Sequence, residues 1–185
     1  RAVRRRFWIA GDVKYLSTTA LALAETKVLN EEVTLRAVFE GGMLNSMGGY
    51  TTRVTDRFFG NSKIRGFEAN GIGPRDLMLG TGNDDALGGN IYATARFEAD
   101  FPLGLPEEYG INGGVFLDIG SVWGLDDTDG TDGPVDDSMK LRSAVGVSVF
   151  WKTPIGPLRF NFSKALLKED YDLEQTFDLT VSTKF

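Results

Sequence analysis

The chain has 185 residues, no cysteine, no histidine, and a formal net charge of −6. The absent cysteines and histidines exclude a disulfide framework, a Cys/His metal site, and thiol or imidazole catalysis. The acidic balance disfavours a nucleic-acid partner, because the basic run Arg4-Arg5-Arg6 is too short to form a binding patch.

No apolar stretch reaches the length of about 18 residues that a transmembrane helix needs. Apolar and polar residues instead alternate, as in β-strands, in about seven segments. In chain order these cover 5–20, 32–41, 89–103, 111–123, 139–153, 157–166 and 175–185. Most are about ten residues long, which suits a tilted strand crossing a hydrocarbon core about 30 Å thick. The sequence therefore predicts an all-β fold, a transmembrane antiparallel β-barrel with apolar side chains toward lipid and polar ones toward the lumen.

The connections between these segments alternate between long and short. The long ones, 42–88 and 124–138, are rich in glycine and aspartate, whereas 104–110 and 154–156 are short and contain proline. Outer-membrane barrels have long extracellular loops and short periplasmic turns. The alternation therefore predicts a periplasmic C-terminus. The connection 22–31 is longer than a tight turn, and we expect it to extend the flanking strands.

About seven strands cannot close a single-chain bacterial barrel, which uses an even number of about eight or more. Open sheet edges in lipid would leave backbone groups without hydrogen bonds. We therefore expect 1–185 to be the C-terminal part of a longer barrel whose N-terminal part precedes Arg1; the alternative is that its sheet edges pair with another chain.

The long connection 42–88 contains Ile64-Arg65-Gly66-Phe67, followed by the run Asn70-Gly71-Ile72-Gly73-Pro74-Arg75-Asp76. The first run resembles the tip of the loop that folds into the lumen in the BamA/TamA family of outer-membrane insertases and their two-partner-secretion relatives. The second run resembles the continuation of that loop. Further runs at 87–90, 116–123 and 151–158 resemble the same family in the same order. The resemblance implies a barrel of about 16 strands, within the known range for such barrels, with 42–88 folded into its lumen.

Arg65 and two acidic residues are the candidate anchors of this loop. Inside a lumen a guanidinium needs a carboxylate or carbonyl partner. Strand alternation places Glu98 and Asp118 on inward faces, and the family resemblance implies that they pair with the loop-tip arginine. We expect a bidentate pair that pins the loop, with Gly66 allowing a tight turn beside it. The alternative is a solvated arginine at a loop tip.

The last segment carries Phe177, Leu179, Val181 and Phe185 on one face. Ending on an aromatic residue resembles the C-terminal signal of outer-membrane proteins, and such a residue also anchors a strand at the membrane interface. The family resemblance implies that this strand forms one side of a weak lateral gate. A client strand would be templated there by β-augmentation.

The connection 124–138 holds six aspartates, but their spacing does not fit an EF-hand. We expect a solvated loop and no metal site. No base accompanies the serines, and Glu107-Glu108 lie in a predicted turn, so we expect no enzyme activity and no cofactor.

The resemblance implies a factor that inserts and folds client β-barrels in the bacterial outer membrane. Its partners would be outer-membrane lipid and lipopolysaccharide, unfolded outer-membrane proteins, and accessory lipoproteins, with POTRA domains upstream. The alternatives are a translocation pore of the same superfamily and a structural or lipid-binding barrel. A soluble β-sandwich is disfavoured by the alternating loop lengths.

Overall fold

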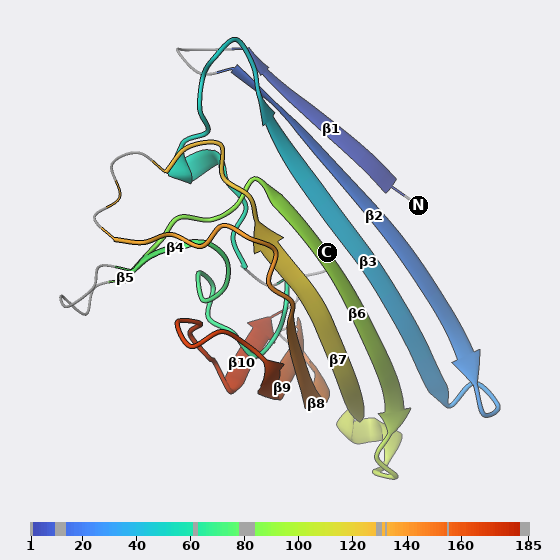
Figure 1. The fold of residues 1–185 in the computed structure, drawn as a ribbon. Coiled ribbons are helices and arrows are strands. Elements are labelled where there is room, and N and C mark those ends of the chain that lie inside the picture. The colour runs from blue at the N-terminus through green and yellow to red at the C-terminus, as the bar shows by residue number, and fades with distance from the viewer. Residues whose placement is uncertain are drawn as a thin grey trace.

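The computed structural model describes residues 2–9, 14–60, 63–77, 84–128, 131, 133–154 and 156–181. Most of them form one antiparallel sheet of eight strands, which curves around the long loops on one of its sides (Figure 1). In spatial order the strands are β1 (Ala2–Ile9), β2 (Lys14–Val28), β3 (Val33–Ser46), β6 (Ile91–Pro102), β7 (Ile111–Trp123), β8 (Arg142–Thr153), β9 (Gly156–Leu167) and β10 (Phe177–Val181). The predicted all-β antiparallel fold is confirmed. Within this chain the sheet is not closed, and β1 and β10 form its edges.

The first predicted strand, 5–20, is wrong as a single element. The structure has two strands there, β1 and β2, which pair antiparallel with each other. Gly11-Asp12 lie between them in the sequence, and these residue types favour hairpin turns. The expected extension into 22–31 is present, because β2 continues to Val28 and β3 begins at Val33. The connection between them then becomes a short turn, at the same end of the sheet as the other short connections (Figure 1).

The outer face of the sheet is apolar and exposed. Its exposed large side chains include Leu35, Phe39, Phe97, Val115, Val145, Val147, Phe162, Phe177, Leu179 and Val181. The inner face buries polar side chains, among them Thr94, Asp118, Ser148, Asn161 and Ser163. This distribution is the reverse of that in a water-soluble sheet, where large apolar side chains are mostly buried. It is the distribution expected where the outer face meets lipid.

The connection from β3 to β6 covers 47–90, rather than the predicted 42–88, because β3 continues through Ser46. It contains the short 3₁₀ turn η1 (Val54–Asp56) and a two-stranded ribbon of β4 (Arg75–Leu77) and β5 (Asp84–Ala86). A second 3₁₀ turn, η2 (Glu107–Tyr109), lies between β6 and β7. Within the described residues no helix is long and apolar enough to cross a membrane.

The small apolar core lies between this connection and the inner face of the sheet. Ile64, Phe67 and Ile72 of the connection are 2%, 6% and 2% exposed. They form one cluster with Tyr92, Val122 and Ala144 of β6, β7 and β8. Burial of these side chains, at about 1.5–3 kcal/mol each, holds the connection against the sheet.

Candidate functional site: the loop tip on the inner face

Residues 63–71, here called the loop tip, are held to the sheet by Arg65. Its Nε and Nη2 atoms donate to the two carboxylate oxygens of Asp118, both at 2.7 Å, and its backbone N–H donates to the same carboxylate at 3.0 Å. Its Nη1 donates to Glu98 at 2.6 Å. The guanidinium also lies 3.6 Å from the centre of the Phe116 ring. The structure thus brings the three expected residues together, in the bidentate geometry that suits a carboxylate.

Glu98 joins three arginines from distant parts of the chain. Besides Arg65, it accepts hydrogen bonds from Arg36 on β3, at 3.0 Å, and from Arg159 on β9. The Glu98 side chain is only 8% exposed, so these cations compensate a carboxylate largely removed from water. Two strands, β7 and β8, separate β6 from β9 in the sheet. The pair Arg159–Glu98 therefore bridges the inner side of the curved sheet.

Sequence alternation could place Arg36 and Arg159 on inward faces, but it could not predict that they meet Glu98. Alternation fixes the face of the sheet to which a side chain points, and not the partner that the curvature brings to it. These two arginines are the functional residues that the sequence analysis missed on the strands.

Gly66 lies where the loop tip comes closest to the sheet. Its φ is +91°, a left-handed conformation that favours glycine. A Cβ atom added there would lie 2.9 Å from the Cβ of Ala144 and 3.5 Å from that of Ser163. Both the backbone conformation and the space therefore require glycine between Arg65 and Phe67.

The loop tip also pairs with the segment that precedes β10, a contact that the sequence did not predict. Phe67 and Glu174 form an antiparallel β-bridge. The Gln175 N–H donates to the Gly66 carbonyl at 3.0 Å, and the Glu68 N–H donates to the Leu173 carbonyl at 2.9 Å. The backbone hydrogen bonds of the tip are thus satisfied by residues more than a hundred positions later in the chain.

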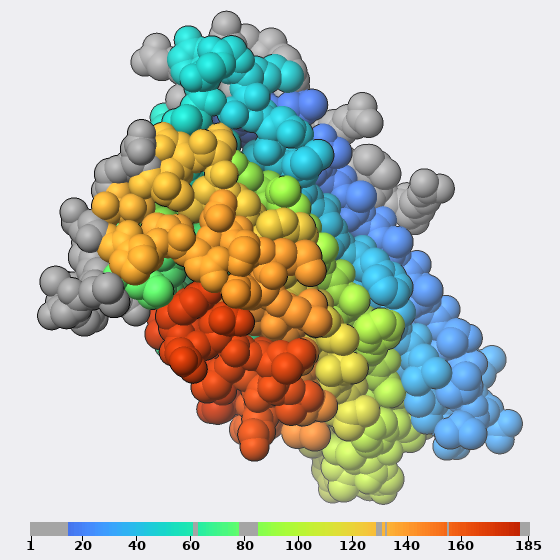
Figure 2. Space-filling view, viewed as in Figure 1, coloured from blue at the N-terminus to red at the C-terminus, as the bar shows by residue number. Residues whose placement is uncertain are grey.

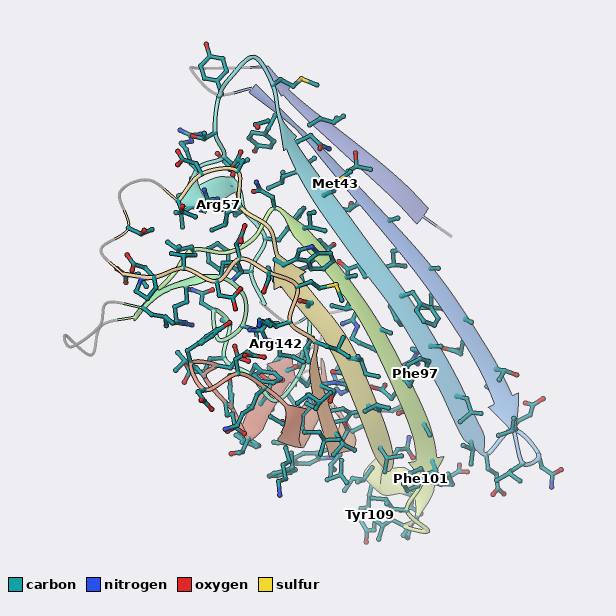
Figure 3. All side chains as sticks on the ribbon, viewed as in Figure 1. Met43, Arg57, Phe97, Phe101, Tyr109 and Arg142 are labelled. Atoms are coloured by element: carbon teal, nitrogen blue, oxygen red, sulfur yellow. The ribbon has the colours of Figure 1, made fainter. Side chains whose placement is uncertain are left out.

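A buried ion pair fixes that same segment to β8. Arg142 donates from Nε and Nη2 to the two oxygens of Asp172, at 2.9 and 3.0 Å. The two side chains are 1% and 0% exposed. Arg142 lies among the loops beside the sheet (Figure 3). In the sequence, Asp172 stands in an acidic stretch typical of a solvated loop, so no signal identified it.

The predicted residues of the last strand are only partly described. Phe177, Leu179 and Val181 lie on β10 and are 46%, 48% and 54% exposed on the outer face. Phe162 on β9 contacts Phe177, with ring centres 5.2 Å apart. Phe185 lies outside the described residues. One backbone edge of β10 pairs with β9, and no described strand of this chain pairs with the other.

The aspartate-rich connection 124–138 forms hydrogen bonds with the long loop 47–90. Asp126 accepts hydrogen bonds from the Thr52 N–H at 2.8 Å and from its hydroxyl at 2.7 Å. Asp76 of the loop accepts the Gly133 N–H at 2.8 Å. Among the described residues, no group of three or more acidic side chains is placed to hold a metal ion. The two connections therefore hold each other in place.

The contact between Thr52 and Asp126 should respond to acid. Burial alone would raise the pKa of Asp126, but the hydrogen bonds from Thr52 outweigh it and hold the pKa below its ordinary value. Because the folded pKa is depressed, the carboxylate stabilises this contact above the ordinary pKa and ceases to do so as pH falls through the lowered one. We expect protection of the Thr52 amide against hydrogen exchange, corrected for intrinsic rates, to persist at pH 5 and fall below about pH 4.

The matched control for that measurement is Asp126→Asn, which should remove the pH dependence and leave the Thr52 amide weakly protected throughout. Thr52 protection that falls with the same midpoint in both proteins would show that another group controls the contact.

The Omp85 superfamily domain model matches residues 6–185. The outer membrane protein assembly factor BamA of Neorickettsia risticii (strain Illinois) is 34% identical over 177 residues, which cover 96% of this chain and 23% of that protein. The outer membrane protein assembly factor BamA of Neisseria meningitidis serogroup B is 29% identical, over 78% of this chain and 21% of that protein. The chain thus spans less than a quarter of the length of these relatives.

The fold is similar to that in the crystal structure of BamA from Haemophilus ducreyi lacking POTRA domains 1-3. The TM-score is 0.74 at 22% identity, and the match covers 91% of this chain and 35% of that one. At this identity the likeness concerns the fold alone: the eight-stranded sheet matches part of that barrel.

Proposed function

The chain belongs to the Omp85 superfamily, and from this membership we propose that it is part of an assembly factor that folds and inserts β-barrel proteins into the outer membrane. The observation that carries the proposal is the 34% identity, over 96% of the chain, to a relative named as such a factor. The apolar outer face and the polar, ion-paired inner face support a position in a lipid bilayer with an aqueous lumen.

The mechanism we propose is passive and rests on the edge of β10. A strand edge presents a row of backbone N–H and C=O groups that can pair with another chain. Among the described residues, the ladder of β10 with β9 runs from Phe177 to Val181. In the complete protein this edge would form one side of a weak lateral gate. An unfolded client strand would add to it by β-augmentation, and its backbone hydrogen bonds would be made before it leaves the protein for lipid.

The orientation and partners are part of the same proposal. The short connections 29–32, 103–110 and 154–155 lie at one end of the sheet, which would face the periplasm together with the C-terminus. The loop 47–90 would fill part of the lumen. Outer-membrane lipid, lipopolysaccharide, unfolded client barrels and accessory lipoproteins are the partners that this function requires, and it requires neither a cofactor nor nucleic acid.

The function can be tested with the full-length protein reconstituted in lipid vesicles. An unfolded client β-barrel should fold faster in these vesicles than in vesicles holding an equal amount of an unrelated outer-membrane barrel. The reason is that the lateral gate lowers the barrier to strand insertion. Folding is measured by gel electrophoresis in SDS, in which the folded client migrates differently from the unfolded client as long as the sample is not heated. Equal rates in the two preparations would contradict the proposal. Export of a partner into the vesicle lumen without client folding would instead identify a translocation pore.

A further inference from the structure

The chain changes its pairing partner where β10 begins. From Thr176 onward it pairs with β9, whose Ser163 N–H donates to the Thr176 carbonyl at 2.9 Å. The preceding residues, 172–175, here called the lead-in segment, pair with the loop tip instead. Leu173 donates to the Gly71 carbonyl at 3.0 Å, in addition to the bonds that Glu68 and Gln175 make. The loop tip thus continues the strand pairing of β10 at its upstream end.

Space and anchoring differ on the two sides of this junction. The loop tip is fixed through Arg65 to β6 and β7. The inner face of β10, with Asp178 and Thr180, borders a cavity of about 410 Å³ that the loop tip and Arg159 also line. β10 therefore borders open space on its inner side. Its upstream end is held by β9 at Thr176 and by the loop tip through the lead-in segment.

Arg142 and Asp172 hold the lead-in segment. Beyond the bidentate pair, Arg142 donates to the Lys140 carbonyl at 2.9 Å, and Asp172 accepts the Glu169 N–H at 2.8 Å. Neither residue is among the described side-chain partners of the loop tip. Burying an ion pair gains little stability over an apolar pair, but it fixes one geometry, because each charge has few acceptable positions. The surfaces of 168–181 and of the segment around Arg142 lie directly against each other (Figure 2).

We propose that Arg142 and Asp172 are positioning residues that keep the lead-in segment paired with the loop tip, so that the upstream end of β10 stays fixed to the loop tip. The proposal rests on the proposed function for the role of β10 as a gate strand, whereas the coupling itself concerns only this chain. A displacement of β10 would then leave its upstream end at the loop tip, which Arg65 holds to β6 and β7.

The first test is Asp172→Asn in the full-length protein in lipid vesicles. The change keeps the shape of the side chain and leaves the buried Arg142 without its counter-charge. The amides of Glu68, Leu173 and Gln175 should exchange with solvent about tenfold faster or more, since hydrogen bonds to charged groups are the stronger ones. The exchange rates of amides in the middle of β7 should be unchanged. This result distinguishes a local displacement of the lead-in segment from a general loss of stability.

The matched control is Glu174→Gln, which removes the same charge from the same segment. The Glu174 side chain is 35% exposed, and its one ion pair among the described residues is with Lys168, itself 47% exposed. Its removal should leave the exchange at the loop tip unchanged. Equal exchange rates at the loop tip in wild-type protein and Asp172→Asn would overturn the proposal, as would equal acceleration throughout β7.

A second test does not depend on the folding of that variant. Phe67 and Glu174 face each other as a pair that is not hydrogen-bonded, whose Cα atoms typically lie about 4.5 Å apart, within the reach of a disulfide. Because the chain has no cysteine, Phe67→Cys with Glu174→Cys can be compared in its oxidised and reduced forms. Client folding should proceed at the same rate in both. A rate that is lost on oxidation and returns on reduction would show that the loop tip and the lead-in segment must separate. Failure of the reduced form and of wild-type protein to fold clients would count against the proposed function, while the exchange result would still decide the coupling.

Discussion

Arg65→Ala is expected to destabilise the folded protein by about 3–5 kcal/mol, the range for removing one partner of a buried ion pair. Asp118 is 0% exposed and receives two side-chain hydrogen bonds and one backbone hydrogen bond from Arg65. Without the guanidinium its carboxylate would remain buried with an uncompensated charge. The effect is measured as the shift of the unfolding midpoint of the full-length protein in detergent, together with protease cleavage within 47–90.

Two variants separate charge from packing in that experiment. Arg65→Lys keeps the charge but loses the planar fork that contacts both acids, so its effect should be intermediate. Arg65→Ala combined with Asp118→Asn should be less harmful than Arg65→Ala alone, because the buried charge has gone. The control is Arg53→Ala in the same loop, whose side chain is 65% exposed and, within the part of the chain that the structure describes, forms an ion pair with Asp56 alone. If Arg65→Ala changed stability no more than Arg53→Ala, the loop tip would be held by its apolar residues alone.

The strands of the C-terminal half could be predicted because alternation there is interrupted by clear turn residues. The predicted segment 111–123 coincides with β7, which ends at Trp123, just before Gly124. Alternation carries the period of a strand but not its end, so the predicted segment 5–20 merged β1 with β2, which residues 10–13 separate in the sequence. The continuation of β2 to Val28 explains why the predicted connection 22–31 did not fit the expected alternation of loop lengths.

The candidate site, too, could be predicted from the sequence only in part. Alternation placed Glu98 and Asp118 on the inner face, and the family resemblance supplied Arg65 as their partner. Arg142 and Asp172 carried no such signal, because they lie 30 residues apart and Asp172 belongs to a connection with no periodicity. Their meeting depends on the path of two loops over the inner face, which is a property of the tertiary fold. The same holds for the contact of Thr52 with Asp126, 74 residues away.

Gly66→Ala is expected to displace the loop tip by two separate effects. A non-glycine residue at φ +91° introduces backbone strain of about 1–3 kcal/mol. The added methyl group would also lie 2.9 Å from the Cβ of Ala144, which is itself fully buried, so the tip must move away from β8. We expect a lower unfolding midpoint and faster hydrogen exchange at the Glu68 and Gln175 amides. Their hydrogen bonds join the loop tip to the lead-in segment and therefore depend on the position of the loop tip.

The same loop supplies a control that carries the strain without the clash. Gly49 has φ +78°, and a Cβ added there meets no atom within 4 Å. Gly49→Ala should therefore show the backbone contribution alone and leave exchange at the loop tip unchanged. Ala144→Gly combined with Gly66→Ala should recover the steric part only, leaving a deficit similar to that of Gly49→Ala. A Gly66→Ala protein no less stable than Gly49→Ala would mean that the tip tolerates a methyl group, and that Arg65 rather than close approach sets its position.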